Sequence, residues 1–395
     1  MKILWVATKA PWPPVDGGRL LLWNTLAALR QAGDEVTLVA PYLQQPDRLT
    51  SCETQLRTVC RPELVPSRLR SSGLDLALSM ATRRPWTLVR HRNVKVLRRV
   101  SAELADVEYD VVVAEQVQAL SQIPQSSEGP PVVLRAQNVE SDLWQALAAA
   151  PGGSAAVRWG LRHQSRCLAH FEGRAVLRSA VTAALTEHDA TALRVLAENR
   201  AHVEVVPATV EEDLPAGREL DGDPALVLFG SSGWKPNAEG ARLFLRRAWT
   251  EILRRHPGAV LHLFGDLSTE SVAGSDHGSS IRSHPSPDDS RTALAENSIL
   301  VVPLTVASGV RMKILEAWAR GVAVVASPAA ARGLVVDDGE LVVAETSDGW
   351  PEAIDDCIAS YDDLVARARR RLQETYSPAA SRRAWHSLFE SAICR

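Results

Sequence analysis

Short runs rich in Val, Ile and Leu alternate with longer amphipathic segments along most of this sequence, and no other feature restricts its fold as strongly. The short runs are continuously apolar, as expected of parallel strands that are covered on both faces. A polar segment rich in Gly and Pro, Pro215–Pro224, interrupts the pattern, which then starts again. The sequence therefore predicts an α/β protein built from two doubly wound, Rossmann-like units in tandem.

The expected elements follow directly from this pattern. The strands are expected at Lys2–Ala7, Glu35–Ala40, Asp110–Ala114, Pro131–Ala136, Ala180–Leu185, Val203–Pro207, Ala225–Phe229, Ala259–Phe264, Ser298–Pro303, Val322–Ala326 and Glu340–Val343. Helical patterns cover Arg19–Ala32, Thr87–Leu104, Ala155–Arg178 and Asp189–Asn199. We expect an N-terminal domain over residues 1–214 and a C-terminal domain over 215–377. A last helix within 378–395 either stays on the second domain or packs back on the first.

The composition excludes several classes of function. Lys plus Arg number 44 and Asp plus Glu 47, so the formal charge of −3 gives no general attraction to nucleic acid. Five scattered cysteines lack a C-x-x-C pair and the ten histidines form no zinc motif, so we expect neither a disulfide framework nor a metal site. No stretch approaches the roughly 18 apolar residues of a membrane span. We therefore expect a cytoplasmic protein.

A loop containing glycines follows the first strand of each unit. In the first unit the pair Gly17-Gly18 precedes a helix, where the backbone can approach a ligand closely and the helix N-terminus favours an anion. In the second unit the loop after Phe229 contains the cation Lys235 and Asn237, which can cap the helix that follows. The alternative is purely structural, with glycines that turn the chain, an N-cap and a solvated charge.

The strongest local signal is the segment PLTVASGVRMKILE, in which a strand runs into a small-residue loop and then a helix. The loop contains Ser308-Gly309 and the helix is expected to begin near Val310. The first backbone N–H groups of such a helix can hold a phosphate, and Arg311 or Lys313 would add positive charge.

Glu316 lies about two turns into the same predicted helix. A carboxylate at this place suits bidentate hydrogen bonding to the two hydroxyls of a ribose. The alternative is a surface carboxylate paired with Arg320 at i,i+4, which stabilises a helix by only a few tenths of a kcal/mol. The spacing alone does not decide between the two.

Four blocks of the sequence resemble retaining glycosyltransferases of the GT-B fold, namely glycosyltransferase family 4 (group 1), and the opening resembles bacterial exopolysaccharide-associated sugar transferases. The blocks are PWPPVDGGR, LRAQNVES, FGSSGWKPNAEG and VVPLTVASGVRMKILEAWARGVAVVAS, which occur in the expected order. The resemblance implies two Rossmann-like domains that face each other across a cleft. It further implies transfer of a sugar from a nucleotide-diphosphate sugar to an acceptor hydroxyl, with retention of configuration and without a metal or another cofactor.

The resemblance also implies roles for individual residues. Glu316 resembles the second Glu of the family's Glu-x7-Glu motif and would hold the ribose, while Arg311 and Lys313 would neutralise the leaving diphosphate. Gln137 would orient a sugar hydroxyl. The nucleotide sugar would further contact Gly17, Gly18, Ser231, Trp234, Lys235, Asn237, Gly265, Ser308, Gly309 and Val310. The acceptor would enter near Glu115 and Asn138.

The sequence departs from the family pattern at two positions. The first Glu of the motif falls on Ser308, and the strand end that often holds an active-site His is occupied by Gln137. An amide cannot hold a proton as a base does, although in a retaining transfer the diphosphate itself can take the proton from the acceptor. Two alternatives follow, a pseudo-glycosyltransferase with an unusual donor and a protein that binds nucleotide sugars without catalysis.

One further segment, residues 83–99, holds seven basic residues and no acidic one. Val89, Val96 and Val100 recur at helical spacing, so one apolar stripe can pack while the basic faces stay exposed. The segment is either a solvated helix of the first domain or a contact surface, at the inner membrane face, for anionic lipid or a phosphorylated, lipid-linked acceptor.

Overall fold

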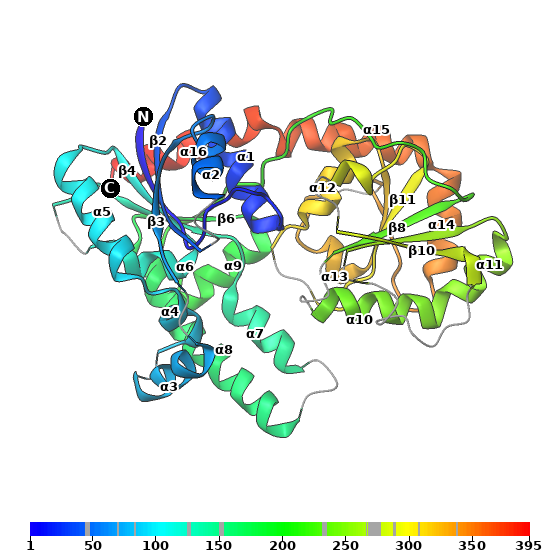
Figure 1. The fold of residues 1–395 in the computed structure, drawn as a ribbon, viewed down its shortest axis with the longest axis horizontal. Coiled ribbons are helices and arrows are strands. Elements are labelled where there is room, and N and C mark those ends of the chain that lie inside the picture. Colours follow the sequence, from blue (N-terminus) through cyan, green and yellow to red (C-terminus); the bar gives the residue numbers. More distant parts are fainter. Residues whose placement is uncertain are drawn as a thin grey trace. The chain divides into compact units, whose positions relative to one another are not determined.

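The computed structural model describes residues 1–43, 48–68, 71–82, 84–124, 128–149, 154–230, 235–265, 267, 278–286, 290–306, 309–336 and 339–395. The chain forms two compact units (Figure 1). The first unit comprises Met1–Thr209, Ser308–Val310 and Pro378–Arg395. The second comprises Val210–Ala307 and Arg311–Ser377.

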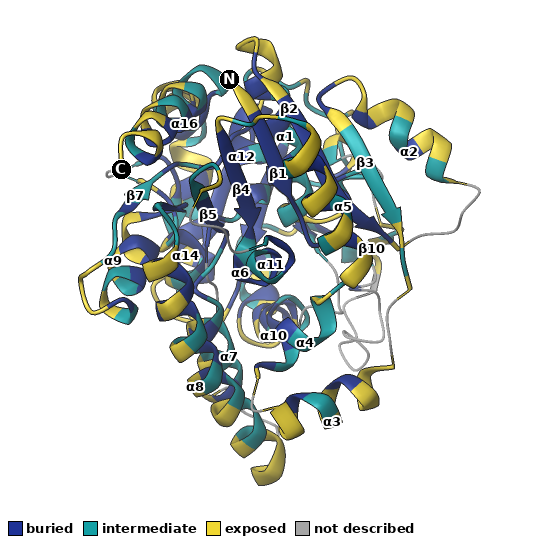
Figure 2. Cartoon of the chain, turned by 90° about the vertical axis from the view of Figure 1, so that its left-hand side faces the viewer, coloured by how far each residue is buried: buried dark blue, intermediate teal, exposed yellow. Residues whose placement is uncertain are grey.

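The first unit is built on a parallel sheet of seven strands in the order β3-β2-β1-β4-β5-β6-β7. The strands are β1 (Lys2–Val6), β2 (Glu35–Tyr42), β3 (Arg61–Pro66), β4 (Val111–Glu115), β5 (Val132–Ala136), β6 (Val181–Ala184) and β7 (Val203–Val205). Chain order runs outward from β1 in both directions, as in a doubly wound sheet. The central strands are buried, as the dark blue of β1 and β4 in Figure 2 shows.

Helices cover both faces of this sheet. They are α1 (Gly17–Gln31), α2 (Leu49–Leu56), α3 (Ser72–Thr82), α4 (Trp86–His91), α5 (Val94–Asp106), α6 (Gln116–Ala119), α7 (Glu140–Ala149), α8 (Ala155–Arg178), α9 (Glu187–Leu196) and α16 (Pro378–Ile393), with a 3₁₀ turn, η2 (Leu120–Gln122). The helix α1 turns Leu22, Leu26 and Leu29 to the sheet at i, i+4 and i+7. Burying each of these leucines contributes about 1.5–3 kcal/mol.

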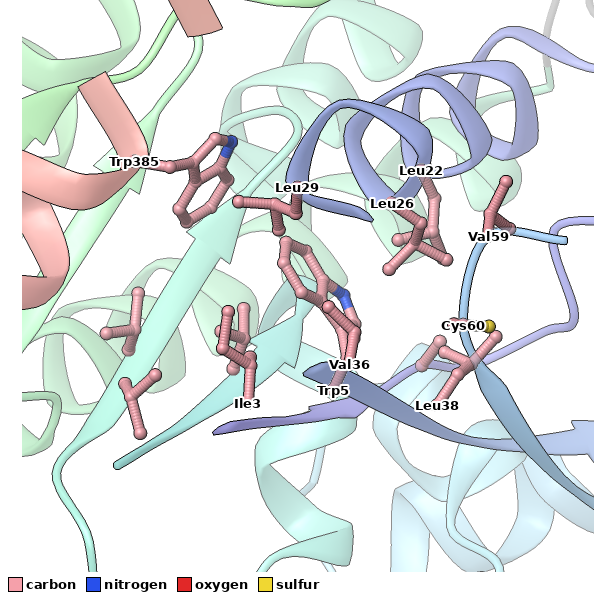
Figure 3. Packing of buried hydrophobic residues seen from close by; sticks show 14 of the residues in the cluster. Ile3, Trp5, Leu22, Leu26, Leu29, Val36, Leu38, Val59, Cys60 and Trp385 are labelled. Atoms are coloured by element: carbon pink, nitrogen blue, oxygen red, sulfur yellow. The ribbon is translucent and has the colours of Figure 1, made fainter. Parts of the chain in front are cut away.

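The C-terminal helix α16 belongs to this first unit. The Trp385 ring lies edge-on to the Trp5 ring of β1, with 5.2 Å between their centroids. Figure 3 shows both rings in the cluster that α1 and the sheet share. The polypeptide therefore returns to the first sheet after completing the second.

Two expectations for the first unit were incomplete or wrong. The edge strand β3 was not expected, because its sequence RPELVP carries two prolines and two charges. Residues 87–104 do not form one helix, since α4 ends at His91 and α5 begins at Val94. Asn93 has an extended backbone and its Oδ1 accepts a hydrogen bond from the N–H of Lys95 at 3.0 Å, which makes it the N-cap of α5.

The second unit has a parallel sheet of six strands in the order β10-β9-β8-β11-β12-β13. The strands are β8 (Ala225–Phe229), β9 (Val260–Phe264), β10 (Ile281–His284), β11 (Ser298–Val302), β12 (Ala323–Ala326) and β13 (Val342–Val343). The short edge strand β10 was not expected. The two sheets confirm the prediction of two parallel, Rossmann-like α/β units.

The helices of the second unit pack Trp249, Trp350 and Phe244 against this sheet. They are α10 (Lys235–Phe244), α11 (Thr250–Arg255), α12 (Met312–Ala319), α13 (Pro328–Ala331), α14 (Trp350–Ala359) and α15 (Tyr361–Arg371). Two π-helical turns, η3 (Leu245–Trp249) and η6 (Leu372–Tyr376), and two 3₁₀ turns, η4 (Gly278–Ser280) and η5 (Ser290–Thr292), complete the unit.

Candidate functional site

At the carboxyl ends of β8 and β9 in the second unit, two glycines allow the backbone segments to approach closely. A Cβ added at Gly265, whose φ is +102°, would lie 2.6 Å from the carbonyl oxygen of Gly230. A Cβ at Gly230 would lie 2.7 Å from Asn237 Nδ2 and 3.1 Å from Lys313 Nζ. The two glycines therefore leave the space into which the polar side chains of α10 and α12 reach.

Lys313, in the first turn of α12, is directed toward the end of β8. Its Nζ donates to the carbonyl oxygen of Phe229 at 2.5 Å and to Asn237 Oδ1 at 3.5 Å, and lies 5.1 Å from the Phe229 ring centroid. Burial lowers the pKa of Lys313 to about 8, with a further lowering by Arg311 and an opposing effect of Glu316. The ammonium group is thus held in a desolvated place where an anion would stabilise its charge.

The start of α12 supplies further positive potential. The helix begins at Met312 with Arg311 as its N-cap, two residues later than the expected start near Val310. Gly309 precedes it with a φ of +68°, in the left-handed region that favours glycine. The positive end of the helix dipole and the guanidinium of Arg311 make this end of α12 suited to an anion.

Glu316 lies one turn beyond Lys313 and is half-buried. Its Oε1 accepts a hydrogen bond of 2.5 Å from the hydroxyl of Ser290. That hydroxyl oxygen accepts in turn from Arg320, whose Nε and Nη2 lie 3.3 Å and 3.2 Å away. The hydroxyl of Ser290 therefore links Glu316 to Arg320, which the sequence had suggested as a direct pair. Ser290 itself was not predicted from the sequence.

Asn237 does not cap its helix, because α10 begins two residues earlier, at Lys235, and its Oδ1 accepts from Lys313 instead. Ser231, Trp234 and Ser308 lie outside the described residues, as does the side chain of Lys235.

In the first unit, the site residues gather at the carboxyl ends of β4 and β5. Gln137 follows β5, and its Nε2 donates to Glu115 Oε1 at 2.6 Å and to the carbonyl oxygen of Gly18 at 3.3 Å. Its Oε1 accepts from Gln116 Nε2 at 2.9 Å. The amide of Gln137 is thereby fixed in orientation, with its N–H groups toward Glu115 and its oxygen toward Gln116.

Glu115 and Arg135 form a buried ion pair beneath Gln137. The second oxygen of Glu115 accepts from Trp5 Nε1 at 2.7 Å and from Arg135 Nη1 at 3.4 Å. The guanidinium of Arg135 lies over both the Trp5 ring and the Trp385 ring, 5.6 Å and 5.5 Å from their centroids. Burial lowers the pKa of Arg135, and the carboxylate of Glu115 opposes that shift. The sequence signal that could have revealed this pair is Arg135, a charged residue within an otherwise apolar strand.

The glycine loop of the first unit packs directly on this cluster. Gly17 and Gly18 open α1, whose N-cap Asp16 accepts from the N–H of Arg19 at 2.9 Å. A Cβ at Gly18 would lie 2.7 Å from Gln137 Oε1. The structure therefore brings together Gly17, Gly18, Glu115 and Gln137, and Asn138 is the next residue of the chain.

Within the residues that the structure describes, no three His, Cys, Asp or Glu side chains gather in a way that could hold a metal ion. No helix within those same residues is both long and apolar enough to cross a membrane.

Comparisons with known proteins agree with this architecture. Residues 223–360 match the family model described as glycosyl transferases group 1, so the second unit carries a domain of this group. A sucrose-phosphate synthase from Thermosynechococcus elongatus superposes with a TM-score of 0.70 at 15% identity, over 100% of this chain and 99% of the other. The chain has the GT-B fold. A search of curated proteins found no match.

Two further solved structures share this fold over nearly their whole length. Anabaena HepE in complex with UDP-glucose has a TM-score of 0.63 at 15% identity, covering 99% of this chain and 100% of that one. A mutant of S. aureus TarM in complex with fondaparinux, α-GlcNAc-glycerol and UDP has a TM-score of 0.68 at 9% identity, covering 98% and 100%. At such identities the likeness establishes the fold alone.

Proposed function

We propose that this chain is a glycosyltransferase that moves a sugar from a nucleotide-diphosphate sugar to an acceptor hydroxyl, with retention of configuration and without a metal ion. The observation that carries the proposal is the place of Lys313. Its desolvated ammonium lies at the carboxyl end of β8, beside the start of α12, within the segment that matches the glycosyl transferases group 1 model. Ligands of open α/β sheets bind at this end of the strands.

The positive groups at α12 suit a leaving diphosphate. As the bond between sugar and diphosphate breaks, negative charge grows on the diphosphate oxygens. Lys313, Arg311 and the first backbone N–H groups of α12 stabilise that charge with dipoles already in place. The main contribution to rate would come from this stabilisation and from the alignment of donor and acceptor.

Glu316 would hold the ribose of the nucleotide. Its Oε1 accepts from the hydroxyl of Ser290, so this oxygen suits a hydroxyl donor, and a ribose hydroxyl would take the place of Ser290. A ribose offers two neighbouring hydroxyls to one carboxylate. HepE, which shares the fold, is described in complex with UDP-glucose, so a uridine nucleotide is the first probe to use.

We assign the acceptor to the first unit, near Glu115, Gln137 and Asn138. The amide of Gln137 cannot take up a proton at neutral pH, so it would orient a hydroxyl rather than act as a base. In a transfer with retention, the acceptor attacks on the face that the diphosphate leaves, and the diphosphate takes the proton.

The rival function is binding of a nucleotide sugar without transfer, or the joining of an unusual activated donor by a pseudo-glycosyltransferase. The observation that favours it is the engagement of Gln137, whose amide already bonds to Glu115, Gln116 and the carbonyl of Gly18. An amide that already forms these hydrogen bonds within the protein has less hydrogen-bonding capacity left for a substrate.

Thermal unfolding with UDP, GDP, ADP and dTDP, each with and without EDTA, tests the proposal. A nucleotide at 100 times its Kd stabilises the protein by about 2.7 kcal/mol, which such a measurement resolves. The matching sugar nucleotide is then assayed for hydrolysis and for transfer to simple glycosides, with NMR of the anomeric proton of the product. Turnover with retention supports the proposal, whereas binding without turnover for every donor and acceptor establishes the rival.

A further inference from the structure

The helix α3 buries polar side chains and exposes apolar ones, which is the reverse of the usual arrangement at a protein surface in water. Its buried side chains are Asp75 and Ser79, which are 0% and 2% exposed. Three of its four large apolar residues are exposed, Leu74, Leu76 and Met80, by 51%, 48% and 70%, while Leu78 is half-buried. Surface helices of soluble proteins normally bury the apolar stripe and expose the polar one.

Polar contacts attach α3 to the rest of the first unit. Asp75 pairs with Arg90 at 3.4 Å, and Arg90 also donates to the hydroxyl of Ser72 at 3.2 Å. The hydroxyl of Ser79 donates to the carbonyl oxygen of Arg84 at 2.7 Å. These contacts fix the rotation of the helix, so the outward direction of the apolar face is set by the fold. In Figure 2 most of α3 has the colour of exposed residues, interrupted by buried and intermediate ones.

The exposed face of α3 is free of charge over its whole length. Leu74, Ala77 and Met80 follow one another at i, i+3 and i+6, and Leu76 lies beside Met80 at i+4. The eleven residues of the helix extend over about 16 Å, too short to span a bilayer and of a length that can lie in its surface. Interfacial helices have this combination of an apolar face and an orientation set by polar contacts on the other side.

The charge around α3 is positive. Residues 67–102 contain nine Arg and Lys and a single acid, Asp75, and that acid is buried against Arg90. Exposed Arg68 and Arg84 stand on either side of the helix in the chain, and Lys95 is exposed on α5. Each basic residue close to an anionic membrane adds about 1 kcal/mol of attraction.

A second interfacial group lies at the same end of the unit. Figures 1 and 2 both place the start of α8 at the end where α3 lies, away from the two termini. Trp159, in the second turn of α8, is 68% exposed and stacks on His163. Tryptophan is enriched at the boundary between headgroups and acyl chains.

We propose that α3 is an interfacial helix that inserts Leu74, Leu76 and Met80 into the surface of a membrane rich in anionic lipid, while the arginines beside it contact the headgroups. This inference does not depend on the proposed function. It places the apolar part of the expected membrane contact in α3 and keeps exposed Arg84 and Lys95 of residues 83–99. Arg90 and Arg99 of that segment are engaged with Asp75, Glu63 and Glu103. Anionic lipid fits this face better than a protein partner does, because exposed Arg68 and Arg84 flank the uncharged helix in the chain.

Flotation of the full chain with lipid vesicles tests this inference without any nucleotide or sugar. We expect binding to vesicles of phosphatidylcholine with phosphatidylglycerol at low salt, weaker binding at high salt, and little to phosphatidylcholine alone. Leu76→Glu combined with Met80→Glu should reduce the bound fraction by about tenfold. The matched control is Val195→Glu, an exposed valine of α9 in the same unit, which should bind like the wild type.

A charge-reversal pair separates local contact from total charge. Arg68→Glu with Arg84→Glu should weaken binding and flatten its salt dependence. Arg242→Glu with Arg246→Glu, two exposed arginines of the second unit, gives the same total charge and should not. The inference is overturned if the wild type binds no anionic vesicle or if the Leu76/Met80 variant binds as well as the wild type. Self-association of the wild type that this variant abolishes, without lipid binding, also overturns it in favour of a protein interface.

Discussion

The amide of Gln137 and the carboxylate of Glu115 share a hydrogen bond of 2.6 Å at the carboxyl ends of β5 and β4. The other oxygen of Glu115 accepts hydrogen bonds from Arg135 and Trp5. Gln137, at the carboxyl edge of the sheet, is therefore linked through Glu115 to the buried charge of Arg135. Through the carbonyl of Gly18, the same amide also fixes the start of α1. Gln137 thus links the glycine loop to a buried ion pair.

Removal of the charge from Glu115 should cost more stability than any surface substitution. Glu115→Gln leaves the guanidinium of Arg135, which is 1% exposed, without its anionic partner. Breaking a buried pair in this way costs about 3–5 kcal/mol. Urea unfolding at pH 7 measures the loss. Glu187→Gln, which removes an exposed partner of Arg194, serves as the control and should leave stability unchanged.

Two glycines in helices should respond oppositely to alanine. At Gly160 of α8 an added Cβ meets no atom within 4 Å, so Gly160→Ala should stabilise the protein by about 0.5–1 kcal/mol. At Gly18 the added Cβ meets Gln137 Oε1 at 2.7 Å, so Gly18→Ala should displace the amide and lower turnover. Thermal melting and initial rates of both variants give the comparison. Full activity of Gly18→Ala would show that the loop tolerates a moved amide.

The strands that the sequence predicted and those it missed differ in their place in the sheet. Interior strands such as β1 and β11 are covered on both faces and paired on both sides, and all their residues after the first are apolar. The two missed strands, β3 and β10, are sheet edges. An edge strand pairs on one side only and tolerates the prolines and charges of RPELVP. Apolarity alone therefore cannot reveal it.

The site residues that the sequence predicted also differ from those that it missed. The glycine loops, Lys313 and Glu316 were predicted because each belongs to a short segment whose local pattern has a chemical meaning. The support of Arg135 by Trp385 was not predictable, because 250 positions separate them and only the fold brings α16 back to β1. Ser290 was missed for the same reason, since its contact to Glu316 joins two separate elements.

The stability of the first unit should fall as the pH rises through neutrality. Glu172, fully buried in α8, accepts from the N–H groups of Glu140 and Ser141 at the start of α7 at 2.6 Å and 2.9 Å. Burial nevertheless raises the pKa of Glu172 from 4.5 to about 7. The folded state therefore binds the proton more tightly than the unfolded state between these values.

This contribution is complete below pH 4.5 and is lost as the pH rises through 7. Its size is about 3 kcal/mol, at 1.36 kcal/mol for each unit of pKa shift. Urea unfolding at several pH values between 4.5 and 8 measures it. Glu172→Gln should flatten the dependence, whereas Glu187→Gln should not. An unchanged slope in the Glu172 variant would assign the dependence to other groups.

Glu316 should contribute to nucleotide affinity rather than to folding. Glu316→Gln removes the charge while the shape is kept, so ribose hydroxyls lose a charged acceptor and binding of the cognate nucleotide should weaken by about 1.5–3 kcal/mol. Calorimetry measures the change, with Glu345→Gln, at an exposed carboxylate of the second unit, as the control. Equal affinities of the variant and the wild type would refute the assignment.

The charge of Lys313 should make nucleotide binding depend on pH in the alkaline range. Burial lowers the pKa of Lys313 from 10.5 to about 8, so the free protein loses this charge as the pH rises through 8. A diphosphate binds the charged form, and its affinity should fall between pH 7 and 9. Folding stability should change in the opposite direction, since the unfolded state binds the proton more tightly between pH 8 and 10.5, and stability therefore rises with pH there.

Two substitutions distinguish the charge of Lys313 from its packing. Lys313→Met keeps the length of the side chain and removes the ammonium, so nucleotide affinity at pH 7 should fall to a value that no longer changes up to pH 9. Lys313→Arg keeps a charge that does not titrate in this range, so its affinity should be similarly flat but higher than that of the Met variant. Calorimetry at pH 7 and 9 on all three proteins gives the comparison. A decline with pH that persists in the Met variant would place the titrating group elsewhere and remove Lys313 from the diphosphate site.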